Sequence, residues 1–416
     1  MNRVIIVGNG FDLAHGLETK YEHFINWYWG RWLKLLYSST SQFEKDELFE
    51  ITCSSGCLSG YFYTGSTEQN VFKHKETILD KEKKKGVIEF KLSDLLFRIS
   101  KSIESKGWVD VENDYYELLV ENVNEKDKIR KLNRDLTVVQ HLLTEYLGAV
   151  QSQNINISIV KNDLREKMLA PFSKNEIAES ASMHWTKFIY NRGDINSTGA
   201  MFHFFSDYGI SNYSKEEIEK LLKKEQPAIL SNRQFSDEAG KNFLLPNRVM
   251  LLNFNYTNTA DLYLPQNDRF VVNHIHGELT NPDSIVFGYG DETDDEHQVI
   301  LKKNDNEYLR HFKTYRYLET PNYRQLLSFI ESEPFQVCII GHSCGLSDRT
   351  MLKTIFEHKN CVSIKPYYYI NENGRDNYLD IVQNISRNFT DMSKMRDRVV
   401  NKTFCEPFVN YKEMQD

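Results

Sequence analysis

The sequence predicts an α/β protein in which helices flank a mostly parallel β-sheet and a large, mostly helical insertion interrupts that sheet. Two observations indicate this fold class. Strand-like apolar runs lie near the two ends of the chain, and several are continuous rather than alternating, which is typical of strands covered on both faces. Between these ends, apolar residues recur every three or four positions, which is the spacing of amphipathic helices.

The strand-like runs define the predicted domain organisation. They occupy residues 4–7, 249–255, 269–277, 285–290, 335–343 and 361–370. Only the first run precedes the helical region, so we expect a discontinuous core formed by residues 1–37 and 245–416. Residues 38–244 would then form the insertion, and an active cleft would lie between the insertion and the core.

The clearest helix is predicted within residues 110–151. Its apolar side chains step by three and four along the chain, at Leu132, Leu136, Val139, Leu143, Tyr146, Leu147 and Val150. The aromatic-rich stretch FINWYWGRWLKLLY at 24–37 is expected to face a core, and self-association into a homo-oligomer is the alternative. Residues 38–107 include the charge run KEKKK at 81–85 and show no sustained period, which indicates a solvated loop or a small insertion.

Composition narrows the class of protein. The 416 residues carry a net charge of −8 and 40% hydrophobic residues, so we expect a globular protein without a general attraction to nucleic acid. No apolar run is long enough to cross a bilayer and no cleavable hydrophobic leader precedes the first strand, which predicts a cytoplasmic protein with no membrane partner. The six cysteines are sparse and are interpreted as reduced thiols. Cys53-x-x-x-Cys57 lacks the further ligands of a zinc site, so no metal is predicted.

The first strand ends in a bare turn, Gly8-Asn9-Gly10. Glycines between a strand and a helix leave backbone N–H groups accessible, so phosphate oxygens can approach a helix N-terminus. The turn therefore predicts a nucleotide-binding loop, although any tight strand-to-helix turn can use glycine. Asp12 either caps the following helix or contacts the ligand. No third glycine follows at the spacing of a dehydrogenase fingerprint, which disfavours an ordinary dehydrogenase.

Polar residues follow three more of the predicted strands. Asn255 ends one run, His276-Gly277 ends another, and Gly341-His342-Ser343 ends a third. Ligands bind outside the carboxyl ends of the strands in open α/β sheets, so we expect these residues to meet the glycine turn in one pocket. A histidine there, with an unperturbed pKa of about 6.5, is a candidate general base. A structural histidine is the alternative.

Two further pairs of residues have alternative roles. His274 and His276 face the same side of an extended strand, but no third metal ligand is evident. Asp110 and Glu112 precede the predicted long helix, where they favour the positive end of its dipole. Contact with substrate is the alternative role if the insertion covers the cleft.

Several segments together resemble the bacteriophage abortive-infection AbiH family. They are GNGFDLAHGLETKYEHF at 8–24, WVDVE at 108–112, LNFNYTNT at 252–259, HIHGEL at 274–279, FGYG at 287–290 and IIGHSCGLSDRTML at 339–352. These segments span nearly the whole chain in the order of that family. The same skeleton is similar, more distantly, to sirtuin-like NAD-binding domains, and this similarity implies a Rossmann-like core.

The sirtuin-like resemblance also implies roles for individual residues. It implies that His276 is the catalytic histidine and that Asn255 holds the ribose or the attacking water. The residues implied to bind the nucleotide are Gly8, Asn9, Gly10, Asp12, Gly277, Gly341 and Ser343. Thr257 stands where the sirtuin-like segment has Asp, and the zinc cysteines and an arginine of deacetylating sirtuins have no counterpart. Deacetylation is therefore disfavoured.

The expected function is that of an anti-phage protein that binds NAD or a related nucleotide. As a candidate NAD glycohydrolase, it would cleave NAD to nicotinamide and ADP-ribose and deplete NAD in infected cells after meeting a phage trigger protein. The alternative is a nucleotide-binding sensor or toxin that does not hydrolyse its ligand and acts through a protein partner. Action on nucleic acid ranks last, because the sequence has neither a metal-binding acid cluster nor a basic, aromatic-rich stripe.

Overall fold

The structure is a computed structural model, and it describes residues 1–62, 88–106, 110–154, 161–230, 238–292 and 295–410. Its internal contacts divide the chain into two compact units, each formed by separate stretches of sequence. Unit 1 comprises residues 1–16, 155–285 and 317–416, and unit 2 comprises residues 17–154 and 286–316. None of the described helices combines the length and the apolarity that crossing a bilayer requires.

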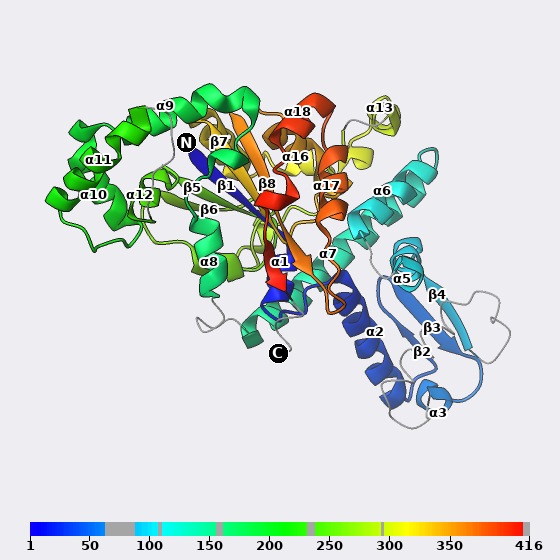
Figure 1. Cartoon of the computed structure of the whole chain (residues 1–416). Helices are drawn as coiled ribbons and strands as arrows, with labels where there is room; N and C mark the ends of the chain where they lie inside the picture. The colour runs from blue at the N-terminus through cyan, green and yellow to red at the C-terminus, as the bar shows by residue number, and fades with distance from the viewer. Residues whose placement is uncertain (63–87, 107–109, 155–160, 231–237, 293–294, 411–416) are drawn as a thin grey trace. The chain divides into compact units, whose positions relative to one another are not determined.

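A six-stranded parallel sheet forms the centre of unit 1 (Figure 1). Its strands are β1 (Asn2–Val7), β5 (Val249–Asn253), β6 (Phe270–His274), β7 (Phe335–Ile340), β8 (Cys361–Ile370) and β9 (Pro407–Asn410). They are arranged in the order β6-β5-β1-β7-β8-β9, and every neighbouring pair is parallel. Numbered along the chain within this sheet, the order is 3-2-1-4-5-6, as in Rossmann dinucleotide-binding sheets. The predicted α/β class and parallel sheet are confirmed.

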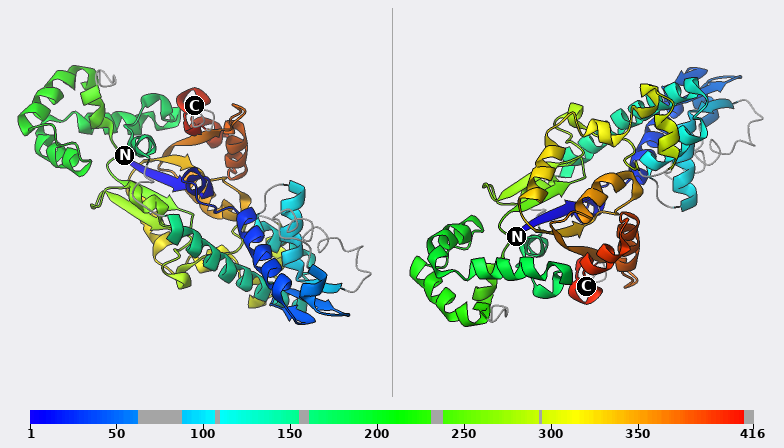
Figure 2. Two further views of the ribbon diagram at one scale, coloured as in Figure 1. Left: turned by 90° about the horizontal axis from the view of Figure 1, so that it is seen from below. Right: turned by 90° about the horizontal axis from the view of Figure 1, so that it is seen from above.

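Strand β1 lies in the middle of this sheet, between β5 and β7 (Figure 2). Ile5 is opposite Leu251 on one side and Cys338 on the other. All six residues of β1 are buried, and the side chains of Ile5, Val7 and Leu251 belong to one hydrophobic cluster. Burial on both faces accounts for the continuous apolar run in the sequence.

Unit 1 also contains most of the described α-helices. They are α1 (Asn9–Ala14), α8 (Asn162–Leu169), α9 (Ser182–Arg192), α10 (Thr198–Asp207), α11 (Lys215–Leu230), α12 (Glu238–Lys241), α15 (Asn322–Ser332), α16 (Arg349–Phe356), α17 (Tyr378–Arg387) and α18 (Met392–Arg398). Helix α15 packs against β6, whereas α16, α17 and α18 pack against β8. Helices α9 to α12 lie near the start of β1 (Figure 1), where Trp185 and Phe205 share a core with Met1 and Val362.

Unit 2 is mostly helical and carries a small antiparallel sheet. Its helices are α2 (Tyr21–Ser38), α3 (Leu58–Phe62), α5 (Asp94–Lys106), α6 (Val111–Glu121), α7 (Lys126–Asn154), α13 (Asp295–Leu301) and α14 (Lys313–Arg316). The sheet has the order β2-β3-β4, formed by Phe43–Lys45, Phe49–Cys53 and Ile88–Leu92. The seven apolar residues that predicted the long helix are all buried on α7. Trp29 and Trp32 of α2 are buried as well, so this aromatic helix faces a core, as expected.

Two sequence interpretations differ from the structure. Residues 285–290 were expected to form a strand, but they form a buried loop with a single bridge from Tyr289 to Phe312. Gly288 in this loop has a φ of +150°, and a β-carbon there would lie 1.9 Å from the carbonyl oxygen of His311. The loop is apolar because it is buried, not because it belongs to a ladder. The short strands β2, β3, β4 and β9 were not predicted.

The boundaries of units 1 and 2 also differ from those of the predicted core and insertion. Helices α8 to α12 fall within the predicted insertion, but they belong to unit 1. Apolar side chains of α8 share a core with strands β1 and β5, and those of α9, α10 and α11 share a core with Met1 and Val362. Helix α2 falls within the predicted core, but it belongs to unit 2, where Phe24 contacts Tyr146 of α7 with ring centroids 6.0 Å apart. All six cysteines are free thiols, and four of them are buried.

Candidate functional site

The predicted phosphate-binding turn lies at the carboxyl end of β1, and two of its amides already have partners. The N–H of Gly8 donates to the carbonyl of Ile340 at 3.2 Å, and the N–H of Gly10 donates to the carbonyl of Gly341 at 2.8 Å. Both acceptors lie at the end of β7, the neighbouring strand. These two amides therefore join the β1 turn to the β7 turn.

The three glycines allow these two turns to pack closely. A β-carbon on Gly10 would lie 2.9 Å from Cα of Gly341, and one on Gly8 would lie 2.6 Å from Cα of His342. Gly341 has a φ of +68°, and a β-carbon there would lie 2.2 Å from the backbone nitrogen of Phe11. The absence of side chains is thus required by packing between the turns. Asn9, by contrast, is exposed at the start of α1.

Asp12 lies inside α1 and is almost fully buried, with 1% of its surface exposed. Gly8 is the N-cap of this helix, so the capping role considered for Asp12 is wrong. Its Oδ2 instead accepts a 2.6 Å hydrogen bond from the hydroxyl of Thr257, which follows β5. Burial raises the pKa of the Asp12 carboxyl to about 7, and hydrogen bonds from Thr257, Thr259 and Asn255 act in the opposite direction.

Asn255 connects the β5 loop to the same turn. Its side-chain amide donates to the carbonyl of Gly8 at 3.1 Å. Its backbone N–H donates to Oδ1 of Asn253 at 3.0 Å, and the amide of Asn253 donates to the carbonyl of Thr257 at 2.9 Å. The polar residues that follow β5 therefore hold the loop in place next to Gly8 and Asp12.

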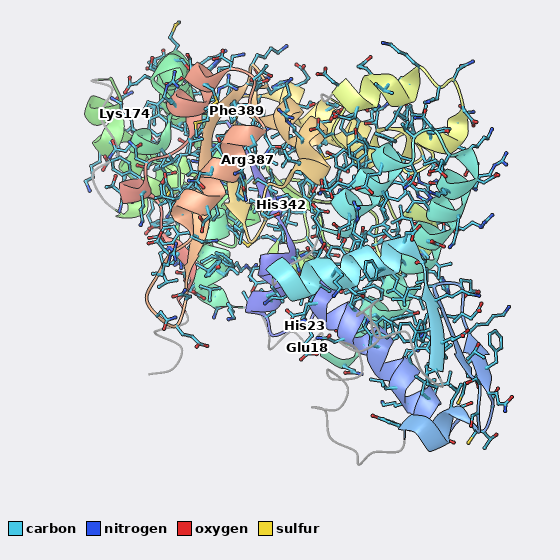
Figure 3. All side chains as sticks on the ribbon, turned by 90° about the vertical axis from the view of Figure 1, so that its right-hand side faces the viewer. Glu18, His23, Lys174, His342, Arg387 and Phe389 are labelled. Carbon is cyan, nitrogen blue, oxygen red and sulfur yellow. The ribbon has the colours of Figure 1, made fainter. Side chains whose placement is uncertain are left out.

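His276 follows β6 and lies in a nearly buried polar cluster. Its Nε2 is 3.0 Å from the hydroxyl oxygen of Tyr317 and 3.2 Å from Oδ1 of Asp348. The other carboxylate oxygen of Asp348 is 3.6 Å from Nε2 of His342. His342 follows β7 and is labelled in Figure 3. The exposed fractions of His276, His342, Asp348 and Tyr317 lie between 5% and 8%.

An aromatic ring contacts both imidazoles. The Phe254 centroid lies 4.9 Å from that of His276 and 4.4 Å from that of His342, and both contacts are edge-to-face. The contacts run from Gly8 to His342, then to Asp348 and His276. Segments that follow β1, β5, β6 and β7 thus meet at one edge of the sheet, with the glycine turn and His276 in the same cluster.

Three other predicted residues have surroundings of their own. His274 contacts Asp261 at 3.0 Å and shares none of the partners given above for His276. Gly277 has a φ of +82°, and a β-carbon there would lie 2.2 Å from the carbonyl oxygen of Ser284, so a tight turn requires this glycine. Ser343 is exposed, and its carbonyl accepts a hydrogen bond from Asn384 at 2.8 Å.

A family model described as bacteriophage abortive infection AbiH matches residues 4–369 of the chain. The chain belongs to the AbiH family. The match covers part of unit 1, the whole of unit 2 and all the polar residues at the strand ends described above. No curated protein and no solved structure matches the chain, so a likeness of this AbiH protein to sirtuins stays a prediction.

Asp110 and Glu112 of this AbiH protein lie in unit 2, where both have structural partners. The Asp110 carboxylate accepts from the N–H of Asn113 at 3.0 Å and caps α6. The acid therefore lies at a helix N-terminus, as predicted, but the helix is α6 and not the long helix α7. Oε2 of Glu112 lies 2.9 Å from Nζ of Lys313, whose side chain is fully buried. The other oxygen of Glu112 accepts from the N–H of Gly288 at 3.1 Å. Glu112 therefore fastens the 286–316 segment to α6.

Three residues of the AbiH cluster had no role assigned from the sequence, although His342 was expected at a strand end in the pocket. Asp348 and His342 lie within the segment 339–352, which contributed to the family resemblance, but no role was assigned to them. A carboxylate that orients a catalytic histidine is a common arrangement, so the presence of Asp348 near a candidate base could have been sought there. Tyr317 lies 41 residues from His276 along the chain, in a segment without any strand-end signal.

Proposed function

We propose that this AbiH protein binds NAD and hydrolyses it to nicotinamide and ADP-ribose during phage infection. The observation that carries the proposal is the gathering of His276, Asp348 and Asn255 at the carboxyl edge of a sheet with Rossmann strand order. In such sheets, dinucleotides bind outside this edge, where the strand order reverses between the first strand and the fourth. Here those strands are β1 and β7.

The proposed reaction breaks the bond between C1′ of the ribose and the ring nitrogen of nicotinamide. The electron pair of that bond moves to the pyridinium ring, which leaves as neutral nicotinamide, while water attacks C1′ and releases one proton. His276 is proposed to accept this proton, and Asn255 to orient the water or a ribose hydroxyl. The transition state resembles an oxocarbenium ion, so the carboxylate of Asp348 would favour the positive charge that develops.

The role proposed for the glycines is packing between two turns and not contact with phosphate. Since the amides of Gly8 and Gly10 donate to the end of β7, these glycines and Gly341 serve to bring two turns together. The exposed residues Asn9 and Ser343 are proposed to contact the nucleotide beside them. Asp12 is proposed to act through Thr257 and Asn255, because its own carboxyl is buried.

The test is nicotinamide release from NAD by the purified protein, with and without lysate of phage-infected cells that supplies a trigger. His276→Ala is expected to lower turnover by roughly 10² to 10⁴-fold with little change in NAD affinity, if His276 is a general base. His184→Ala, which changes an exposed histidine on α9, is the matched control and should retain activity. Binding of NAD without release would favour the sensor, and neither binding nor release would refute the proposal.

A further inference from the structure

Asp348 occupies the position before α16 where an acidic side chain normally caps the helix. A residue at this position usually accepts a hydrogen bond from one of the first free N–H groups of the helix. The Asp348 side chain makes no such bond. Its two oxygens instead face Nε2 of His276 at 3.2 Å and Nε2 of His342 at 3.6 Å. The Asp348 carboxylate therefore lies next to two imidazoles and does not cap α16.

The orientation of His342 is fixed from its other side. The N–H of Cys344 donates to Nδ1 of His342 at 3.0 Å, so Nδ1 is an acceptor and the neutral ring carries its hydrogen on Nε2. That hydrogen faces Asp348. Cys344 has a φ of +54°, a left-handed conformation that is uncommon for a residue other than glycine. The backbone is therefore held in a strained conformation that delivers this N–H to the ring.

The same reasoning gives the hydrogen position on His276. An ionised carboxylate only accepts hydrogen bonds, and Oδ1 of Asp348 lies close to Nε2 of His276. The hydroxyl oxygen of Tyr317, 3.0 Å from the same nitrogen, can accept as well. A hydrogen on Nε2 satisfies these contacts, and the lone pair of the neutral ring then lies on Nδ1.

We infer that Asp348 is the positioning residue of His276: it holds the hydrogen on Nε2 and makes Nδ1 the basic nitrogen, while His342 lies near the other carboxylate oxygen of Asp348. The catalytic meaning of this arrangement rests on the proposed function, but the hydrogen position does not. This arrangement follows the general pattern in which a base is oriented by a third group.

The substitution Asp348→Asn tests this inference, because the N–H of His342 favours one orientation of the new amide. At 3.6 Å the contact between Nε2 of His342 and residue 348 is too long for a hydrogen bond, but the N–H dipole of His342 favours the amide oxygen on its side and turns the NH₂ group toward His276. Nε2 of His276 then has to accept, which moves its hydrogen to Nδ1. In Asp348→Asn combined with His342→Leu, the amide can rotate, and the hydrogen returns to Nε2.

The direct measurement is ¹⁵N NMR of histidine-labelled protein, with the His276 signals assigned by their loss in His276→Gln. The wild type should show hydrogen on Nε2 of His276, Asp348→Asn should show it on Nδ1, and the double variant should again show it on Nε2. Hydrogen on Nδ1 in the wild type, or no change in Asp348→Asn, would overturn the inference. The wild-type spectrum decides the matter even if Asp348→Asn does not fold.

A kinetic measurement separates this inference from the proposed function. Asp348→Asn should lower kcat for nicotinamide release by roughly 10² to 10⁴-fold with little change in KM. Asn has nearly the same size and shape as Asp, so a merely structural Asp348 would leave both parameters unchanged and contradict the inference. A tautomer change in a protein that never releases nicotinamide would refute the proposed function and leave the positioning of His276 intact.

Discussion

Replacing Asp12 by Asn removes a carboxyl group that folding buries next to Thr257. In the folded protein, burial raises the pKa of Asp12 from its ordinary value of 3.8 to about 7. Between these two pH values, the unfolded chain releases this proton while the folded chain keeps it, so the free energy of unfolding falls as pH rises. At 1.36 kcal/mol for each pH unit, the loss amounts to about 4 kcal/mol between pH 4 and pH 7.

Urea unfolding of the wild type and Asp12→Asn at pH 5 and pH 8 measures this effect. The stability difference between the two proteins should shift by about 3 kcal/mol in favour of Asp12→Asn at pH 8, because about two pH units of the window are crossed. The amide can still accept from Thr257, so this hydrogen bond is retained. Asp127→Asn, which changes a side chain that is 97% exposed, should show no such shift. A difference that does not depend on pH would refute the reasoning.

Three further predictions concern stability and can be checked by urea or thermal unfolding. Gly10→Ala should destabilise the protein by about 1 to 3 kcal/mol, since its β-carbon would meet the backbone of Gly341; unchanged stability with weaker NAD binding would instead support a phosphate role for this glycine. Lys313→Ala should cost about 3 to 5 kcal/mol because it leaves Glu112 buried without its ion-pair partner, and adding Glu112→Gln should recover part of the loss. Burial opposes the charged form of His274, but Asp261 and Glu278 raise its pKa above 6.5 overall. This histidine therefore adds stability below pH 6.5 that is lost as pH rises through the folded value, and Asp261→Asn should flatten that dependence.

The sheet was predictable because its strands are buried on both faces. Continuous apolar runs mark β1, β5, β7 and β8 in the sequence as strands covered by helices. The same signal was misleading at 285–290, since a buried loop held by Gly288 is equally apolar. The small strands of unit 2 carry only three to five residues each, too few for an alternation to stand out.

Only the site residues that follow directly after strands were predictable from the sequence. Asn255 and His276 follow strands directly, so the rule for parallel sheets places them at one edge. Asp348 and Tyr317 reach His276 from separate elements, and such contacts depend on packing that no spacing along the chain encodes. The sequence identified the glycines as a tight turn. Glycine is required there because this turn packs against the turn that follows β7, which lies more than 300 residues away in sequence. Local pattern therefore identified the position of the site and not its internal hydrogen bonds.

The central place of β1 has a consequence for how the protein is synthesised. The ribosome makes this strand before the other strands of the sheet, and its neighbour β5 begins about 240 residues later and β7 later still. At about 5 to 20 residues per second, the nascent strand waits roughly 10 to 50 seconds for its first hydrogen-bonding partner. During that time, six residues destined for complete burial are exposed. Chaperones that shield nascent apolar segments should therefore strongly influence the yield of folded protein, and truncated chains cannot assemble the cluster around His276.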